Sequence, residues 1–149
     1  MRISIALILG CFCFGCANAQ TAAPSPDEAT VYIYSTQKTK EIAFRVTASV
    51  YLDEKLIAKL PNGRYFIVGL IPGTHSFYGK SKKRGGVEAN FEAGKFYYLR
   101  LGWEGSLTPN GLTVSPPDNA RFDLKHSKPI EEKDIRDPRV RRDFPPVVP

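Results

Sequence analysis

Cysteine is scarce in this chain of 149 residues, and it is confined to the N-terminal end. The only three cysteines are Cys11, Cys13 and Cys16, so nothing after residue 16 carries a thiol. This absence excludes disulfides, thiolate metal sites and a cysteine nucleophile from the rest of the chain. About 130 residues still suffice to bury roughly two-thirds of the unfolded surface around one core, so the fold does not need disulfides.

Long apolar segments are equally scarce. Residues 3–14 form one apolar run, which is shorter than the about 20 residues that a membrane-spanning helix needs. The run follows Arg2 and precedes Ala17-Asn18-Ala19, which has the small–x–small pattern that signal peptidase cleaves. We therefore expect residues 1–19 to be a secretory signal peptide that is cut between Ala19 and Gln20.

A second cleavage site lies slightly earlier. Gly15 and Cys16 match the last two positions of a bacterial lipobox, whereas Cys13 and Phe14 fit its first two positions poorly. Cleavage before Cys16 would leave that residue for lipid attachment, and residues 20–28 would then serve as a linker. Either product is exported, to the periplasm or the outer membrane, and secretion from the cell is also open.

Signatures of catalysis are absent as well. The string GTHSFYGKS, residues 73–81, resembles a phosphate-binding P-loop, but five residues separate its two glycines where that loop has four. His75 and His126 are far apart and have no partner at the spacing of a metal site. No G-x-S-x-G elbow for a nucleophilic serine is present. We therefore expect no enzyme activity, no cofactor and no metal.

What the chain does contain is a succession of strand and turn signals. The segment AFRVTASVYL, residues 43–52, alternates between apolar and polar positions, as in a strand with one buried face. RYFIVGLI, residues 64–71, is almost continuously apolar, as in a strand buried on both faces. Further strand patterns occur in ATVYIYS, KLIAKL, THSFYG, VEANFEA, FYYLRLGW and LTVS. We predict an all-β domain over residues 29–126, an antiparallel sandwich of immunoglobulin-like or prealbumin-like type with about seven or eight strands.

The C-terminal part carries weaker signals. NARFDLKHS, residues 119–127, is compatible with one more strand. KPIEEKDIR, residues 128–136, has a proline and acids where a short helix would begin. We therefore expect residues 127–149 to be a short helix or a disordered tail rich in proline and arginine.

Basic and aromatic side chains are the candidates for binding. Lys80, Lys82, Lys83 and Arg84 concentrate positive charge in one predicted loop, in a chain of formal net charge +6. Such a loop could bind anionic lipid or lipopolysaccharide, although four cations also suit a merely solubilising loop. Tyrosines on outward strand faces could bind sugars or peptides, or could simply pair across strands. These aromatic residues are Tyr32, Tyr34, Tyr51, Tyr65, Tyr78, Tyr97, Tyr98 and Trp103.

The block VYLDEKLIAKLPNGRYFIVGLIPGTHSF, followed by VEANFEAGKFYYLRL, resembles an uncharacterised bacterial family of lipoprotein-like domains of unknown function. Its hairpin and its P-G-T-H turn are also similar to PEGA-type and carboxypeptidase regulatory-like β-sandwich modules. The resemblance implies an envelope β-sandwich and no particular activity. Such hairpins usually have glycine where this chain has Glu54, so a different turn type or a longer loop is expected there.

These observations favour a non-enzymatic exported module that binds an envelope protein or a glycan, and not a nucleic acid. One alternative is an electrostatic binder of anionic lipid or lipopolysaccharide surfaces through the basic loop. Another is a hydrolase or an inhibitor whose site is assembled around His75 from residues distant in the sequence.

Overall fold

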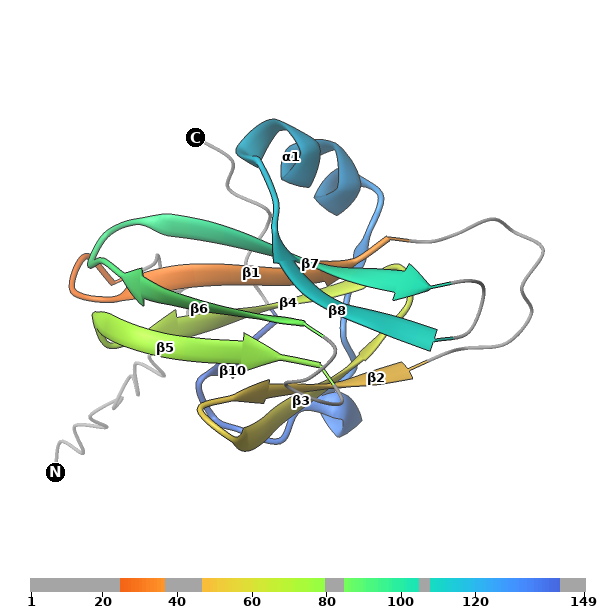
Figure 1. Ribbon diagram of the computed structural model, residues 1–149, viewed down its shortest axis with the longest axis horizontal. Helices are drawn as coiled ribbons and strands as arrows, with labels where there is room; N and C mark the ends of the chain where they lie inside the picture. The colour runs from red at the N-terminus through yellow and green to blue at the C-terminus, as the bar shows by residue number, and fades with distance from the viewer. Residues whose placement is uncertain (1–24, 37–46, 80–84, 105–107, 143–149) are drawn as a thin grey trace, which may run out of the picture.

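A computed structural model describes residues 25–36, 47–79, 85–104 and 108–142 (Figure 1). Ten strands, one α-helix and one 3-10 helix make up this part of the chain. The elements are β1 (Ala29–Ser35), β2 (Thr47–Leu52), β3 (Lys55–Pro61), β4 (Arg64–Leu70), β5 (Gly73–Tyr78), β6 (Gly86–Phe91), β7 (Phe96–Glu104), β8 (Thr108–Val114), α1 (Pro117–Lys125), β9 (Lys128–Pro129), η2 (Glu132–Asp134) and β10 (Val140–Arg141).

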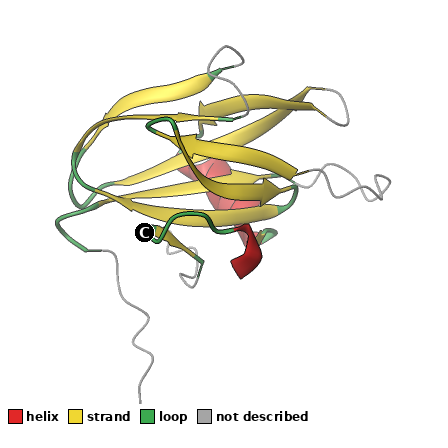
Figure 2. Cartoon of the chain, turned by 90° about the horizontal axis from the view of Figure 1, so that it is seen from below, coloured by secondary structure: helices red, strands yellow, loops and turns green. Residues whose placement is uncertain are grey.

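The strands form two sheets that pack face to face, which confirms the prediction of an all-β sandwich (Figures 1 and 2). The larger sheet has the order β10-β4-β1-β7-β8, with β9 beside β4, and the smaller sheet has the order β3-β2-β5-β6. Most neighbouring strands are antiparallel, but β1 runs parallel to β7 and β4 runs parallel to β9. The larger sheet is therefore mixed, whereas the sequence had predicted a purely antiparallel sandwich.

The core lies between the two sheets and follows from the alternation of side chains along the strands. Val31 and Ile33 of β1 are fully buried there, and Leu52 of β2 and Phe77 of β5 meet them from the smaller sheet. All seven residues of β1 are buried, because β4 and β7 flank its edges and its second face is covered too. The burial on both faces that was predicted for residues 64–71 is confirmed for β4, in which five of the seven residues are buried, but not for Ile71, which follows the strand and is 79% exposed.

α1 covers the second face of the larger sheet, where the sequence analysis expected a strand at 119–127. Proline at the start of the helix and Lys125 in its last turn suit helix geometry. Ala120 and Leu124 are buried at a spacing of four, whereas Phe122 is 69% exposed. Ala120 and Leu124, four residues apart, would share one face in a strand as well as in a helix, whereas Phe122 fits only the strand pattern. The prediction of a strand is therefore wrong.

The segment after α1 belongs to the sandwich rather than to a separate tail. β9 and β10 both pair with β4, and Ile130 and Val140 enter the core. The helix considered for 128–136 is reduced to the single turn η2. Between β9 and β10 the chain passes the edge of β3, where the amide of Arg136 donates to the carbonyl of Ile57 at 2.8 Å. Residues 143–149 lie outside the described part.

The packing of α1 on the sheet predicts unequal effects of two substitutions on the same helix. Leu124→Ala removes a side chain that is 1% exposed, and we expect a loss of about 2–4 kcal/mol in the free energy of unfolding. Phe122→Ala, the control, should change it by less than about 0.5 kcal/mol, because that side chain faces solvent. Urea denaturation of both variants measures the difference, and equal losses would contradict this packing.

Candidate functional site

The outer face of the smaller sheet is the surface on which side chains are available for binding. Its residues are identified by cross-strand pairs that lie directly opposite each other and are exposed or half-exposed. The pairs are Ser49 with Lys59, Tyr51 with Tyr78, Ser76 with Glu88, and Thr74 with Asn90. The surface thus combines two aromatic rings with hydroxyl, carboxylate, amide and ammonium groups.

Tyr51 and Tyr78 form a stacked pair across β2 and β5, the two inner strands of this sheet. Their ring centroids are 5.2 Å apart and their planes differ by 3°. The rings come from β2 and β5, which are joined by only two pairs of ladder residues, Tyr51 with Tyr78 and Leu52 with Phe77. The stack therefore bridges the point where the two hairpins of the sheet meet, and we call this pair the tyrosine shelf.

Most of the other tyrosines that the sequence offered for an open face are buried instead. Tyr32, Tyr34, Tyr65 and Tyr98 are at most 5% exposed and pack with Ile67, Ala120 and Leu124 between the larger sheet and α1. Tyr97 is half-buried against Phe91, at 4.7 Å between ring centroids. The hypothesis that tyrosines form a ligand-binding face is therefore wrong for these covered residues, and it remains a hypothesis for the tyrosine shelf. The side chain of Trp103 lies outside the described residues.

Burial also sets the ionisation of the covered tyrosines. Loss of water around Tyr34 raises the pKa of its hydroxyl, which donates a hydrogen bond to Ser115 Oγ at 2.8 Å. Burial likewise raises the pKa of Tyr98. Both hydroxyls stay protonated at neutral pH and serve the packing of α1.

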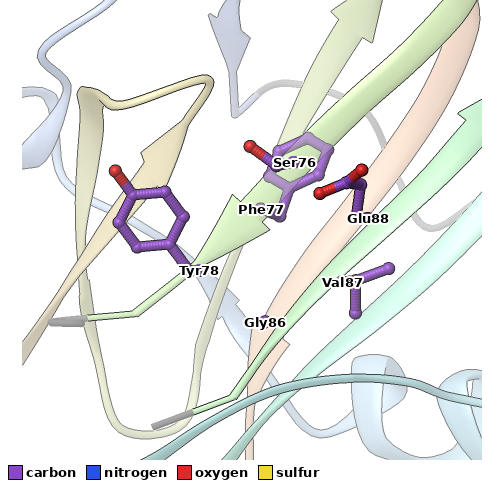
Figure 3. A pocket seen from close by; sticks show the side chains of 6 residues that line it. All are labelled: Ser76, Phe77, Tyr78, Gly86, Val87 and Glu88. Atoms are coloured by element: carbon purple, nitrogen blue, oxygen red, sulfur yellow. The ribbon is translucent and has the colours of Figure 1, made fainter. Parts of the chain in front are cut away.

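A pocket of about 170 Å³ adjoins the tyrosine shelf (Figure 3). It is lined by Ser76, Phe77, Tyr78, Gly86, Val87 and Glu88, all from β5 and β6. Gly86 lies opposite Tyr78, and a Cβ atom there would come within 2.6 Å of the Phe77 carbonyl oxygen and 2.9 Å of Tyr78 Cβ. A larger residue at position 86 would therefore force a shift in β5, which explains why glycine is needed beside the ring of Tyr78.

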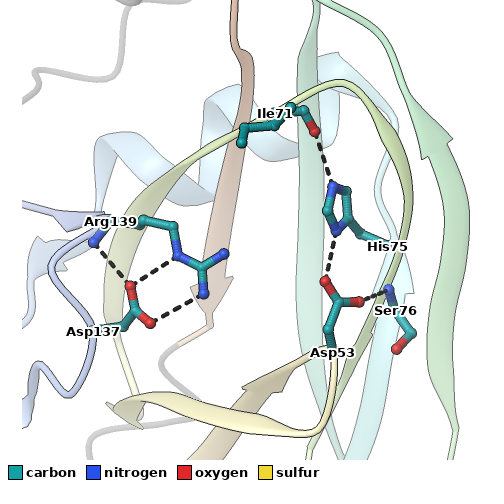
Figure 4. A network of polar contacts seen from close by, with 6 residues as sticks. All are labelled: Asp53, Ile71, His75, Ser76, Asp137 and Arg139. Carbon is teal, nitrogen blue, oxygen red and sulfur yellow. Dashed lines mark hydrogen bonds and ion pairs between the residues drawn. The ribbon is translucent and has the colours of Figure 1, made fainter.

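A polar bracket fixes the strand pairing on which the tyrosine shelf depends (Figure 4). The carboxylate of Asp53 accepts hydrogen bonds from the amide of Ser76, at 2.9 Å, and from His75 Nδ1, at 2.6 Å. The amide of Asp53 donates to the carbonyl of Ser76 at 3.0 Å. These contacts continue the short pairing of β2 with β5 beyond its last ladder pair.

The bracket also explains the turn between β2 and β3. Asp53 and Glu54 have φ angles of 47° and 70°, which is the geometry of a two-residue type I′ turn and not the different or longer turn expected from Glu54. Positive φ is costly for residues other than glycine, and the contacts of the Asp53 carboxylate offset that cost. Partial burial raises the pKa of Asp53, but the hydrogen bonds from Ser76 and His75 outweigh it, so the pKa is lowered.

His75 acts within this bracket as a link between chain segments. Its Nδ1 contacts Asp53 and its Nε2 contacts the carbonyl oxygen of Ile71 at 2.9 Å. Both ring nitrogens of His75 therefore already have a hydrogen-bond partner within the protein. His75 does not line the pocket beside the tyrosine shelf, and both of its nitrogens are bonded within the protein. In this geometry it is not placed to act as a general base on a ligand in that pocket.

A second charged cluster ties the C-terminal segment to the β2–β3 hairpin (Figure 4). Asp137 is 2% exposed and accepts hydrogen bonds from the amide, Nε and Nη2 of Arg139 at 2.9–3.0 Å. Lys55 Nζ, at the start of β3, contacts the same carboxylate at 2.9 Å. The hydrogen bonds from Arg139, more than any other contact, hold the pKa of Asp137 well below its usual range.

A further hollow of about 250 Å³ lies beside the end of α1, lined by Thr36, Phe122, Asp123, His126 and Ser127. Its polar groups bond mainly within the helix. His126 Nδ1 contacts the carbonyl of Phe122 at 2.9 Å, and Ser127 Oγ donates to the carbonyl of Asp123 at 2.9 Å. These side chains cap the helix end, so the pocket beside the tyrosine shelf is the better candidate for a ligand.

The cleavage, lipidation and anion-binding residues that the sequence nominated fall outside the described ranges. They are Cys16, Ala19, Gln20, Lys80, Lys82, Lys83 and Arg84, and their roles stay predictions. In the described part no helix is long and apolar enough to span a membrane, and no group of three or more potential ligands could hold a metal ion. Ser76, Gly86 and Glu88 were missed as a site, because nothing in the sequence shows that β5 and β6 place them around one hollow.

Comparisons with protein-family models, with curated proteins and with solved structures find no significant match. The resemblance to PEGA-type modules and to a lipoprotein-like family therefore stays a prediction.

The depressed pKa values of Asp137 and Asp53 predict a loss of stability in acid. A carboxylate whose pKa is lowered by folding stabilises the fold above its unfolded value, near pH 4, and this contribution is lost as the pH falls toward the folded value. We expect the melting temperature to drop below about pH 4. Asp137→Asn should cost about 1–3 kcal/mol at neutral pH and make the acid dependence shallower.

Calorimetry between neutral pH and the acid limit measures this effect. Asp118→Asn, which changes a 92% exposed carboxylate at the start of α1, is the matched control and should leave the acid profile nearly unchanged. Equal acid profiles for Asp137→Asn and the unmodified protein would contradict the role of this cluster.

Proposed function

We propose that the protein is a non-enzymatic, exported accessory module of the bacterial cell envelope that binds a glycan on the tyrosine shelf and the adjoining pocket. The observation that carries this proposal is the stacked pair of Tyr51 and Tyr78 beside a pocket that also offers Ser76 and Glu88. Export rests on the predicted signal peptide, and a lipid on Cys16 would tether the module through the linker 20–28.

A sugar ring suits the chemistry of this surface. Its C–H face packs on an aromatic ring, and its hydroxyl groups donate to a carboxylate and exchange hydrogen bonds with side-chain hydroxyls. Glu88 is exposed and lies directly opposite Ser76, so the two can hold neighbouring hydroxyls of one ring. The face is open rather than deep, which favours an extended glycan over a small enclosed ligand.

Titration with soluble peptidoglycan fragments tests the proposal. We expect Tyr78→Ala and Glu88→Gln each to weaken binding about tenfold or more, because each removes a direct contact to the sugar. Phe122→Ala, which removes an exposed aromatic ring on the opposite side of the sandwich, should leave affinity unchanged. Full affinity of both shelf variants, with unchanged melting temperatures, would place the ligand elsewhere, and failure of all fragments to bind would overturn the glycan proposal.

A second function is favoured by the position of the basic residues in the sequence. Lys80, Lys82, Lys83 and Arg84 lie in the connection between β5 and β6, which are the two strands that line the pocket. Four cations in one connection are suited to phosphate groups of anionic lipid or lipopolysaccharide. In this alternative the protein is held at a membrane surface by charge.

Vesicles containing phosphatidylglycerol distinguish this alternative. If the connection binds head groups, affinity should fall steeply with salt, and Lys82→Ala, Lys83→Ala and Arg84→Ala together should remove about 3 kcal/mol of binding, at about 1 kcal/mol for each cation. Replacement of Lys59, Lys125 and Lys128 by alanine, which also removes three exposed cations but from other elements, is the charge-matched control. Salt-independent binding, or equal losses in the control, would exclude the electrostatic function.

A further inference from the structure

β6 is an edge strand of the smaller sheet, and it approaches β8 of the larger sheet without forming a ladder with it in the described part of the chain. Among the described elements it is hydrogen-bonded only to β5. The opposite edge, β3, is covered by the chain after η2, through a bridge between Ala58 and Ile135 and the bond from the Arg136 amide to Ile57. A strand whose outer N–H and C=O groups lack a ladder partner is a template for pairing with another strand.

The side chains of β6 show that its packing is incomplete. Val87 and Ala89 point inward and pack against the core, but both are only partly buried. Glu88 and Asn90 point outward and are exposed. The strand holds no proline, and Glu88 is its only charged residue. One more strand beside β6 would complete the burial of Val87 and Ala89.

The free edge of the larger sheet is less suited to such pairing. β8 contains Pro109, which has no amide hydrogen to donate, and Gly111. Its ladder with β7 is also interrupted by an irregularity between Gly102 and Trp103. Proline and bulges are the usual devices that protect an edge strand. β6 has neither, so β6 is better suited than β8 to pair with another strand.

We infer that β6 pairs antiparallel with β6 of a second copy of this chain, about a two-fold axis at Ala89. A two-fold axis perpendicular to the sheet places the outer faces of both copies on the same side of the joined sheet. Each outward-facing residue must therefore lie opposite an outward-facing residue of the second copy, and each inward-facing residue opposite an inward-facing one. With Ala89 at the axis, Glu88 lies opposite Asn90 of the second copy, and Val87 lies opposite Phe91. The outward pair joins a carboxylate to an amide, and the inward pair is apolar.

Neighbouring registers fit less well. With Glu88 at the axis the two Glu88 carboxylates face each other, and with Asn90 at the axis Glu88 faces Glu92. With Val87 at the axis Asn90 and Phe91 are left without partners on β6 of the second copy. The register centred on Ala89 pairs residues 86–92 along their whole length and opposes no like charges.

This pairing has a consequence for ligand binding. The consequence rests on the proposed glycan function, but the dimer itself does not. The two four-stranded sheets become one continuous sheet of eight strands. Both tyrosine shelves then lie on the same face, on either side of the axis. A glycan chain of sufficient length would contact both pockets, which raises its overall affinity without any new contact.

Sedimentation equilibrium of the purified mature protein, over a wide range of concentrations, tests the dimer and its register. The interface of one strand edge is small, so we expect dissociation on dilution. Asn90→Glu places a second carboxylate opposite Glu88 on both sides of the axis and should weaken dimerisation about tenfold. Adding Glu88→Lys to that variant restores opposite charges at both positions and should restore the dimer.

Thr113→Glu on β8 is the control, because it adds the same charge to an exposed residue of the other edge. It should leave the dimer unchanged. A protein that stays monomeric at every concentration overturns the inference. So does a dimer that Asn90→Glu leaves intact, or one that only Thr113→Glu disrupts. Glycan affinity plays no part in these outcomes, so the dimer and the binding function can fail separately.

Discussion

The burial of β1 on both faces and along both edges is the constraint on which the rest of the fold depends. Its inner face contributes Val31 and Ile33 to the core, and β4 and β7 satisfy its edges. Its outer face carries Tyr32 and Tyr34, which are large apolar surfaces that water would otherwise meet. α1 covers that face, and the chain after α1 then returns along β4 as β9 and β10, so that the C-terminal segment completes the larger sheet.

The smaller sheet is built differently, and this asymmetry is what makes it available for binding. Only its inner face contributes to the core, and the outward residues of β2, β5 and β6 are exposed or half-exposed. The two hairpins of this sheet meet through only two ladder pairs, so Asp53, His75 and the Ser76 backbone are needed to hold β2 and β5 in register. The tyrosine shelf and the open edge of β6 thus result from the same incomplete covering.

Local sequence pattern predicts most strands of this fold, but it does not predict the helix α1 or the turn at Asp53-Glu54, and the reasons are physical. Period-two alternation identified the strands 29–35, 47–52 and 86–91, because side chains on opposite faces of a strand meet different surroundings. A continuous apolar run identified 64–70, because both faces of that strand are covered. The same alternation wrongly predicted a strand at 119–127, where Ala120 and Leu124 share one face in a strand and in a helix alike, and contact with the buried tyrosines selects the helix. Glu54 led us to expect a turn other than type I′ at Asp53-Glu54, and this was wrong. The groups that stabilise the positive φ angles lie on β5, more than twenty residues away, so local sequence does not reveal them.

By itself the sequence determined most of the strands, the sandwich class and the absence of cysteine after residue 16, because these depend on local pattern and composition. Only the tertiary structure decided which tyrosines are covered and which form the shelf, since alternation shows that a residue faces outward but not what packs on that face. The same holds for the pocket of Ser76, Gly86 and Glu88, and for the free edge of β6. Both arise from the order of strands in the sheets, which long-range pairing sets and no local pattern records.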